Sequence, residues 1–433
     1  MKRTIAFGIL LSAASLLLSN TVAALVTFNV NSNGDQVDDN LLVATCHTAA
    51  NTCTLRAAVM QANRTNDDVT INVPAGLYVL GTRTVSEGDD NGDLDLTAPV
   101  SGNPLITITG AGANLTIVDG NQTDRVLSVD LGRTGLLNNL TLRNGYRDGT
   151  ASGGGILNRG VLTLSNVIVR DNEITGDGGG IYNEGQLGIY DSTITTNRNV
   201  GGLGGGGITN AAAAGLTLVR STIDTNEAYG DFGGGGILNS GYANIINSTV
   251  SQNAEGGIYG AGGGGIYNAG TVNVYNSTIV NNTVNNGFGG HSGAGIFNSV
   301  SHVLNLRNTI VAGNYLSGNY NDCTGTVGIY GYVVFRTATG CVTDVNSTGT
   351  AFTISSIADL GPLQDNGGPT KTIALVPPSP MIDGAPVSGC VNQNGDPLAT
   401  DQRGRPRIIG ASCDIGAFEY DERIFKNGFE NAG

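Results

Sequence analysis

The stretch Gly153-Gly154-Gly155-Ile156-Leu157-Asn158 decides the fold, because its combination of small residues, one isoleucine and one asparagine occurs six times along the chain. The isoleucine returns at intervals of 25, 27, 29, 29 and 30 residues, as Ile181, Ile208, Ile237, Ile266 and Ile296. Each isoleucine is followed by a second landmark, an aliphatic residue three positions before an asparagine. These asparagines are Asn172, Asn197, Asn226, Asn253, Asn282 and Asn314. Self-similarity at this period is typical of stacked coils.

The residues between the landmarks indicate strands. Threonines such as Thr193, Thr222 and Thr249 separate positions that share one face, and β-branched residues favour an extended backbone. A helical period of 3.6 is absent, and glycine triplets oppose helix. The sequence therefore predicts an all-β parallel β-helix, in which equivalent residues of successive coils stack about 4.8 Å apart. We expect the asparagine columns to satisfy the turns and one another, which is a structural role.

Changes in composition divide the chain into four parts. Residues 1–24 carry Lys2 and Arg3, then an apolar run and small residues, which is typical of a secretory signal peptide. Residues 25–69 are expected to form an N-terminal cap with a short helix that begins after Thr54. Residues 70–345 are expected to form the β-helix, with regular repeats at about 153–314, and residues 346–433 a Pro/Gly-rich C-terminal cap and tail. No later apolar run is long enough for a membrane helix, so we expect a secreted protein.

The six cysteines fit an oxidising compartment. They fall into three local pairs, each beside a loop at one end of the repeats, although fifteen connectivities are formally open. The expected disulfides are Cys46–Cys53, Cys323–Cys341 and Cys390–Cys413. Zinc binding is the alternative, but the spacings do not match a zinc site and only His47 lies near a cysteine.

The net charge of −14 makes nucleic acid a poor partner, because an acidic surface repels polyanions. Solubility is the simplest explanation of this charge. Gly accounts for 68 of 433 residues without a three-residue period, which excludes collagen and assigns the glycines to turns.

Motifs at both ends of the chain resemble known families. The stretch Cys53-Thr54-Leu55-Arg56-Ala57-Ala58 resembles the N-terminal motif of secreted CSLREA-domain proteins. The C-terminal motifs, among them Asp401-Gln402-Arg403-Gly404, resemble the choice-of-anchor Q domain. The repeats look like those of polymorphic outer-membrane proteins, which form right-handed parallel β-helices of the pectin-lyase-like type. The resemblance implies a secreted or surface-displayed right-handed β-helix with an adhesive or glycan-related function.

Differences in coil length indicate a binding edge. Length varies mainly between the second asparagine of one coil and the isoleucine of the next, and insertions on one edge of a repeat protein often form its binding face. The lengthened segments carry Tyr229, Phe232, Tyr259, Phe288 and His291, which we predict to bind a ligand. The alternative is that these side chains pack only against their own loops. Glycans are the expected ligand class, because aromatic side chains on a polar ridge suit sugar faces.

The cluster Asp89-Asp90-Asn91-Gly92-Asp93-Leu94-Asp95 is a candidate calcium site. Alternating oxygen ligands around a glycine turn suit Ca²⁺, which takes six to eight oxygens. The alternative is an ordinary Asp-Gly turn, since the bidentate glutamate of an EF-hand is missing. The protein is thus expected to require no cofactor, with calcium as a candidate ligand at Asp89, Asp90, Asp93 and Asp95.

A catalytic interpretation also has candidate residues. A polysaccharide lyase needs a base beside a cation, and a glycoside hydrolase needs two carboxylates. Asp191 and Arg220 occupy equivalent positions of adjacent coils, and Asp224 lies near them in the pattern. A surface ion pair explains Asp191 and Arg220 more simply. The expected function is therefore a monomeric adhesin-like or glycan-binding protein, whose partner is a polysaccharide, a surface glycan or another cell-surface protein. A polysaccharide lyase or glycoside hydrolase and an inert structural spacer are the alternatives.

Overall fold

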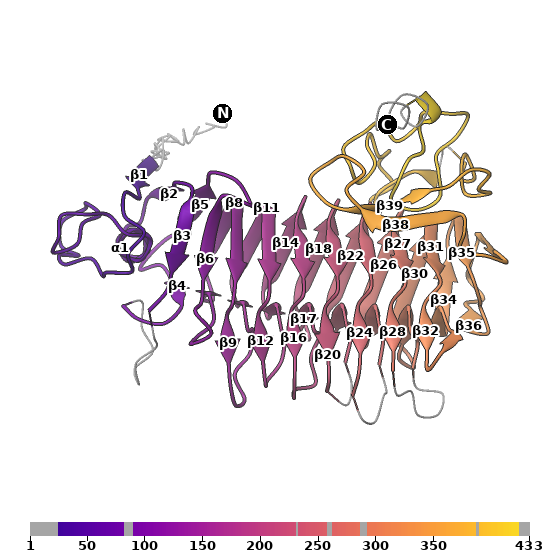
Figure 1. Ribbon diagram of the computed structural model, residues 1–433, viewed down its shortest axis with the longest axis horizontal. Coiled ribbons are helices and arrows are strands. Elements are labelled where there is room, and N and C mark those ends of the chain that lie inside the picture. The colour runs from indigo at the N-terminus through magenta and orange to yellow at the C-terminus, as the bar shows by residue number, and fades with distance from the viewer. Residues whose placement is uncertain are drawn as a thin grey trace, which may run out of the picture.

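The computed structural model describes residues 25–81, 90–230, 233–257, 262–285, 292–386 and 389–423. Within these residues the chain winds into a rod of stacked coils, with the strands of successive coils side by side (Figure 1). Three sheets, A, B and C, run along the rod, and their strands pair in parallel from coil to coil. Parallel strands joined in this way wind in the right-handed sense. The predicted right-handed parallel β-helix is confirmed.

Sheet B contains the repeated isoleucines. Each isoleucine pairs in register with the next, from Ile156 through Ile181 and Ile208 to Ile296, and all of them are fully buried. The strands of sheet B are β4 (Leu94–Leu96), β7 (Leu127–Val129), β10 (Ile156–Asn158), β13 (Ile181–Asn183), β17 (Ile208–Asn210), β21 (Ile237–Asn239), β25 (Ile266–Asn268), β29 (Ile296–Asn298), β34 (Cys323–Ile329) and β36 (Gly340–Thr343).

Sheet A bends once in each coil. Each coil therefore contributes one strand to the first half of the sheet, before the bend, and one strand to the second half, after it. The strands of its first half are β1 (Leu25–Asn29), β2 (Asp68–Val73), β5 (Leu105–Gly110), β14 (Gln186–Tyr190), β18 (Gly215–Val219), β22 (Tyr242–Ile246), β26 (Thr271–Tyr275) and β30 (Val303–Arg307). Those of the second half are β3 (Gly76–Val79), β6 (Thr116–Asp119), β15 (Thr193–Thr195), β19 (Thr222–Asp224), β23 (Thr249–Ser251), β27 (Thr278–Val280), β31 (Thr309–Ala312), β35 (Tyr332–Phe335) and β37 (Thr350–Thr353). Strands β8 (Thr134–Arg143) and β11 (Val161–Arg170) run through both halves.

The bend in sheet A lies at a column of residues with a left-handed backbone. This column consists of Asn139, Asn166, Asp191, Arg220, Asn247, Asn276 and Asn308, whose φ angles lie between 46° and 58°. Asparagine and aspartate tolerate this conformation better than other non-glycine residues, which explains why they recur at the bend.

Sheet C is a narrow ribbon along the third edge of the rod. Its strands are β9 (Tyr146–Arg147), β12 (Glu173–Ile174), β16 (Arg198–Asn199), β20 (Glu227–Ala228), β24 (Ala254–Glu255), β28 (Thr283–Val284), β32 (Tyr315–Leu316) and β33 (Asn319–Tyr320), of which the last pairs antiparallel. The loops of unequal length between sheet C and sheet B contain most of the internal residues that lie outside the described ranges.

Two ladders of buried asparagines run along the rod. In the first, Nδ2 of Asn183 donates to Oδ1 of Asn210 at 2.7 Å, and the same bond repeats from Asn158 to Asn298. In the second, the backbone N–H and Nδ2 of Asn197 both donate to Oδ1 of Asn226. The ladders satisfy buried polar groups at the corners, which is the structural role expected for these columns.

The N-terminal end is covered by helix α1 (Leu55–Ala62). Thr54 caps it by accepting a hydrogen bond from the backbone N–H of Ala57 at 3.1 Å, as the sequence predicts. Arg56 of the CSLREA-like motif is buried and makes two hydrogen bonds to the carboxylate of Asp35, at 2.9 and 3.0 Å. It also donates to the carbonyl oxygens of Gly92 and Asp93, so this arginine fastens the cap to the first strand of sheet B.

The C-terminal segment packs on the side of the rod and not on its end, which corrects the expected position of a C-terminal cap (Figure 1). After β37 the chain turns back, forms β38 (Leu360–Gln364) and β39 (Thr372–Leu375), and lies across the second half of sheet A. Apolar side chains of β27, β31 and β35 share a core with Ile373, Met381, Ile415 and Phe418. We call residues 354–423 the tail.

Polar contacts fix the tail in register with three coils. The amides of Asn247, Asn276 and Asn308 donate to the tail carbonyls of Thr400, Val391 and Gly389 at 2.7, 3.0 and 2.5 Å. Gln402 is fully buried, accepts from the hydroxyl of Thr249 at 2.6 Å and donates to that of Thr222 at 2.9 Å. The tail therefore covers the second half of sheet A and satisfies its threonine and asparagine side chains.

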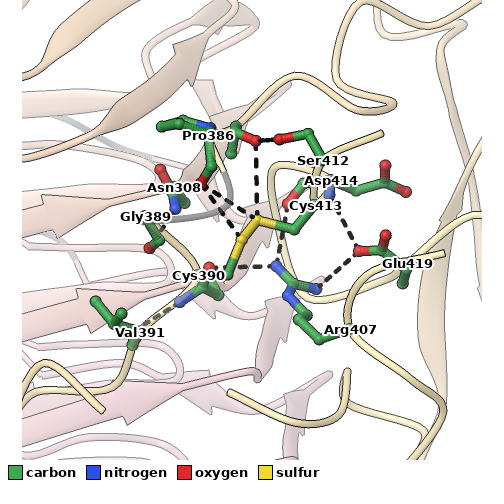
Figure 2. Close-up of a disulfide and its surroundings, with 12 residues drawn as sticks. Asn308, Pro386, Gly389, Cys390, Val391, Arg407, Ser412, Cys413, Asp414 and Glu419 are labelled. Atoms are coloured by element: carbon green, nitrogen blue, oxygen red, sulfur yellow. Dashed lines mark hydrogen bonds and ion pairs between the residues drawn. A yellow bond between two sulfur atoms is a disulfide. The ribbon is translucent and has the colours of Figure 1, made fainter. Parts of the chain in front are cut away.

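The three disulfides join the expected pairs. Cys46–Cys53 lies in the N-terminal cap and Cys323–Cys341 ties β34 to β36 in the last coils. Cys390–Cys413 lies in the tail beside Asn308, and Figure 2 shows Arg407 and Glu419 next to it. Residues 1–24, the predicted signal peptide, lie outside the described residues. No helix in the described part of the chain is long and apolar enough to cross a membrane.

Candidate functional site

The outward side of the first half of sheet A is a strand surface that the tail leaves partly exposed. We call the outward side chains of residues 161–165 of β11 and of β14, β18, β22, β26 and β30 the open face. Alternation along each strand sends Leu187 and Ile189 into the core and leaves Gln186, Gly188 and Tyr190 outside. The tail covers the neighbouring half of the sheet but leaves Tyr242 47% exposed. Asn244, Ile246 and Asn273 of this surface are buried, so its exposed part is formed by residues such as Gln186 and Tyr242.

A hollow of about 310 Å³ lies in the open face. Its walls include Tyr190, Tyr242 and Gln186, and its floor includes Gly188 and Gly215. A Cβ at Gly188 would lie 2.8 Å from Cε2 of Tyr190, so the absence of a side chain lets this ring lie over the strand. Glycine inside a strand weakens it and often marks a place where another group approaches closely. The hollow has the size and the aromatic walls of a small ligand site.

An amide ladder continues the hollow along the rod. Nδ2 of Asn305 donates to Oδ1 of Asn273 at 2.9 Å, and Nδ2 of Asn273 donates to Oδ1 of Asn244 at 3.2 Å. Asn273 also donates to the hydroxyl of Tyr242 at 3.1 Å. These bonds hold the amides and the tyrosine in fixed orientations. Asn244 and Asn273 are buried, so the ladder serves to hold the exposed Tyr242 in place beside the hollow.

Tyr275, Arg307 and Tyr330 follow at the far end of the open face. Tyr275 and Arg307 are register partners on β26 and β30. Burial raises the pKa of Tyr275, Tyr242 raises it further, Arg307 lowers it and Tyr330 raises it, so these four groups lie near one another. The open face therefore combines tyrosine rings, amides and one guanidinium group.

A second candidate site is a polar cleft of about 430 Å³ at the N-terminal end of sheet B. We call it the N-terminal cleft. Its lining is formed by Asp93, Asp95, Thr97, Arg125, Ser128, Asp130, Arg147, Thr150, Ala151, Ser152, Leu157 and Arg159. Arg56 positions one wall, because it holds the carbonyl oxygens of Gly92 and Asp93 at 2.6 and 3.0 Å.

Buried charges gather at this cleft in two ion pairs. Nε of Arg125 lies 3.1 Å from Oδ2 of Asp93, and Nη1 of Arg147 lies 2.7 Å from Oδ1 of Asp124. Burial raises the pKa of Asp93 to about 7, Arg125 opposes this shift, and Asp95 and Asp124 reinforce it. A carboxyl group with a pKa near neutrality can both donate and accept a proton at the operating pH.

The candidate catalytic residues Asp191, Arg220 and Asp224 do not form a common site. Asp191 and Arg220 belong to the bend column, and the guanidinium group makes two hydrogen bonds of 2.7 Å to the carboxylate. Asp224 is buried at the other end of β19, where the hydroxyl of Thr225 donates to its carboxylate at 3.1 Å. Burial raises the pKa of Asp224, whereas Thr225, Thr195 and Lys371 of the tail lower it. The arrangement is a half-exposed ion pair and a separate carboxyl group beside the tail.

Of the five candidate binding residues, Tyr229 alone belongs to the described residues. The residue is 40% exposed, the centre of its ring lies 4.8 Å from the guanidinium carbon of Arg198, and its hydroxyl donates to Oε2 of Glu227 at 2.9 Å. These contacts bind it to its own edge of the rod. Phe232, Tyr259, Phe288 and His291 lie outside the described residues, so the predicted loop edge stays a prediction.

The calcium prediction is only partly described, because Asp89 lies outside the described ranges. Asp90 is exposed and accepts a hydrogen bond from Asn91 at 2.7 Å. Asp93 faces Arg125, and Asp95 accepts a hydrogen bond from the hydroxyl of Ser128. Among the residues with described positions, no three acidic, histidine or cysteine side chains are grouped to hold a metal ion. Calcium binding stays a prediction.

The open face was missed by sequence reasoning, although a signal was present. Asn244, Asn273 and Asn305 each stand nine residues before the second asparagine of their coil, where other coils have Thr163, Gly188 and Thr217. The same column thus contains amides in three coils and an unusual glycine in another. Tyr190 and Tyr275 also share a column, but the coils between them have Val219 and Ile246 there, so the ladder of amides is the clearer signal.

No protein-family model matches the chain, and the search of curated proteins found no match. The solved structure titled "Crystal structure of pectate lyase Pel9A" is similar, with a TM-score of 0.49 and 14% identity over 92% of this chain and 98% of that chain. The assignment of the fold rests on the strand pairing described above. The resemblances to CSLREA-domain and choice-of-anchor proteins stay predictions.

Proposed function

We propose that the protein is an exported saccharide-binding protein whose ligand lies on the open face. The single observation that carries the proposal is the hollow between Tyr190 and Tyr242, with its glycine floor and the adjoining amide ladder. Tyrosine rings offer apolar area for the faces of sugars and hydroxyl groups for hydrogen bonds, and the amide ladder holds Tyr242 in a fixed orientation. A rod that repeats such groups along its axis suits a polysaccharide or a surface glycan.

The charge distribution supports this ligand class. The chain carries a net charge of −14, yet the outward positions of the open face contain no acidic side chain among the described strands. This face therefore offers a ligand mainly uncharged hydrogen-bonding and aromatic groups, which suits an uncharged, hydroxyl-rich chain. The disulfides are compatible with an oxidising compartment outside the cytoplasm.

Retention of the protein on a panel of immobilised neutral polysaccharides tests the proposal. Tyr242→Ala and Tyr190→Ala are expected to weaken binding about tenfold each, equivalent to ~1.4 kcal/mol, because each removes one wall of the hollow. Tyr229→Ala is the matched control on the other edge of the rod. Loss of retention with Tyr229→Ala alone would move the ligand to the loop edge, and no retention of the unmodified protein on any polysaccharide would favour the inert spacer.

Cleavage of a polysaccharide is the second candidate function, and the N-terminal cleft favours it. Asp93 has a pKa near 7 and lies close to Asp95 and two arginines, which are the kinds of groups that lyases and hydrolases use. The same panel is therefore examined for shortened chains. Cleavage that is abolished by Asp93→Asn and unchanged by Asp191→Asn would support an enzyme acting in the cleft.

A further inference from the structure

Arg307 differs from the other outward residues of the open face because it carries a charge. It closes the outward row Val303, Asn305 and Arg307 on β30, while Leu304 and Leu306 point into the core. The remaining outward residues of the described strands are uncharged. The guanidinium group of Arg307 is therefore an isolated positive charge on an otherwise uncharged surface.

Arg307 also lacks a carboxylate partner among the described residues. The ion pairs of the described chain do not include it, and its Nε is buried without a hydrogen bond. By contrast, Arg220 in the adjacent bend column is fully paired with Asp191. In a chain with a net charge of −14, an arginine without an acidic partner is unusual, because buried or half-buried arginines normally pair with a carboxylate.

Its surroundings position the guanidinium group for a ligand. Tyr275 lies beside Arg307 in register, and Tyr330 occupies the next coil after Ile329, the partner of Leu306. Gly331 also lies close to the Arg307 side chain, since an added Cβ at this glycine would be 3.3 Å from Cγ of Arg307. Rigid neighbours restrict the long side chain, so less conformational entropy is lost when the guanidinium group binds an anion.

We propose that Arg307 binds one carboxylate or sulfate group of an otherwise neutral saccharide on the open face. This inference rests on the proposed function and specifies its ligand: a chain with sparse acidic groups. A guanidinium group forms two parallel hydrogen bonds with such an anion, which gives both affinity and register. A densely charged polyanion is excluded as the preferred ligand, because the rest of the acidic protein repels it.

Matched pairs of polysaccharides test this inference with the full chain. The carboxylate arm compares arabinoxylan with glucuronoxylan, and the sulfate arm compares agarose with sparsely sulfated agarose. Polygalacturonate serves as the dense polyanion. The expected result is that one sparsely acidic member of a pair binds about tenfold or more tightly than its neutral counterpart, and that this preference decreases with salt.

Two variants show whether Arg307 is responsible. Arg307→Gln is expected to remove the preference, so that the acidic and neutral members of a pair bind equally well, and Arg307→Lys is expected to keep part of the preference because the charge remains. Thermal unfolding of both variants shows whether they fold. If Arg307→Gln does not fold, Arg307→Lys and the salt series test the inference.

Each outcome decides between the two ideas. Equal binding of neutral and acidic chains, an undiminished preference in Arg307→Gln, or strongest binding of polygalacturonate overturns the role of Arg307, while neutral binding that depends on Tyr242 leaves the proposed function intact. Absence of binding to every neutral and acidic chain overturns both.

Discussion

Asn226 shows how a single buried residue holds neighbouring coils together. Its Oδ1 accepts from both the backbone N–H and Nδ2 of Asn197 at 3.0 Å, and its own Nδ2 donates to Ile194 and Asn253. Every polar atom of this side chain is used, and the residue is fully buried. A buried donor without a partner is costly, so the loss of one asparagine also leaves groups of its neighbours in the ladder unsatisfied.

Replacing Asn226 by Ala is expected to lower the free energy of unfolding by about 3 kcal/mol, because two donors of Asn197 and an acceptor of Ile194 lose their partner. Urea unfolding measures the change. The exposed Asn394→Ala is the matched control, with an expected change below about 0.5 kcal/mol. Equal effects of the two substitutions would show that the ladder contributes little.

A substitution at Gly188 is expected to affect ligand binding and stability differently. Its neighbours in the column are Thr163 and Thr217, so threonine is the residue that the strand itself favours. Gly188→Thr is expected to fill the hollow and displace the Tyr190 ring, which weakens saccharide retention about tenfold or more. Urea unfolding is expected to show unchanged or slightly higher stability. Retention equal to that of the unmodified protein would place the ligand elsewhere.

At the scale of elements, the tail is the part that the sequence did not locate. The coils could be predicted because Ile and Asn recur at nearly constant intervals, so each column is visible in one dimension. The tail binds through single contacts, such as Asn276 with Val391, between residues far apart in the chain and without a period. Its motifs were recognised, but nothing in their order shows which face of the rod receives them.

Gln402 is the central polar contact of the tail, since its side chain bonds to Thr222, Thr249 and Thr370. Gln402→Ala is expected to loosen the tail and leave the coils intact, so limited proteolysis should cut within residues 354–423 about ten times faster. The exposed Gln393→Ala in the same segment is the control. Unchanged proteolysis of Gln402→Ala would mean that the apolar contacts alone hold the tail.

The tail is also expected to respond to pH. Burial and the nearby Asp414 raise the pKa of Glu419 to about 8, although Arg407 and two backbone N–H groups act in the opposite direction. Burial likewise raises the pKa of Asp414 to about 6. The folded Glu419 keeps its proton where an unfolded glutamate has lost it, so this contribution is complete at low pH and is lost as the pH rises through about 8.

Proteolysis of the tail at about pH 5 and about pH 9 tests this dependence. The unmodified tail should be cut faster at the higher pH, and Glu419→Gln should reduce the difference because its side chain remains uncharged. The exposed Glu422→Gln is the control in the same segment. A tail that becomes more resistant at high pH would contradict the direction of the pKa shift.

At the scale of the whole molecule, the stacking of coils places the residues that differ between coils side by side on the surface. The core positions are nearly identical from coil to coil, whereas the outward positions of sheet A are free to vary, so they collect tyrosines, amides and Arg307. The tail covers the other half of the same sheet. The core could therefore be predicted from the repeats, whereas the candidate binding surface depends on which outward face the tail leaves open.

Hydroxyl-radical footprinting of the tyrosines, with and without a retained saccharide, tests the central claim most directly. The account predicts that the ligand protects Tyr242 and Tyr190, which line the hollow, and leaves the labelling of Tyr229 unchanged. Protection of Tyr229 with unchanged labelling of Tyr242 and Tyr190 would contradict a ligand on the open face.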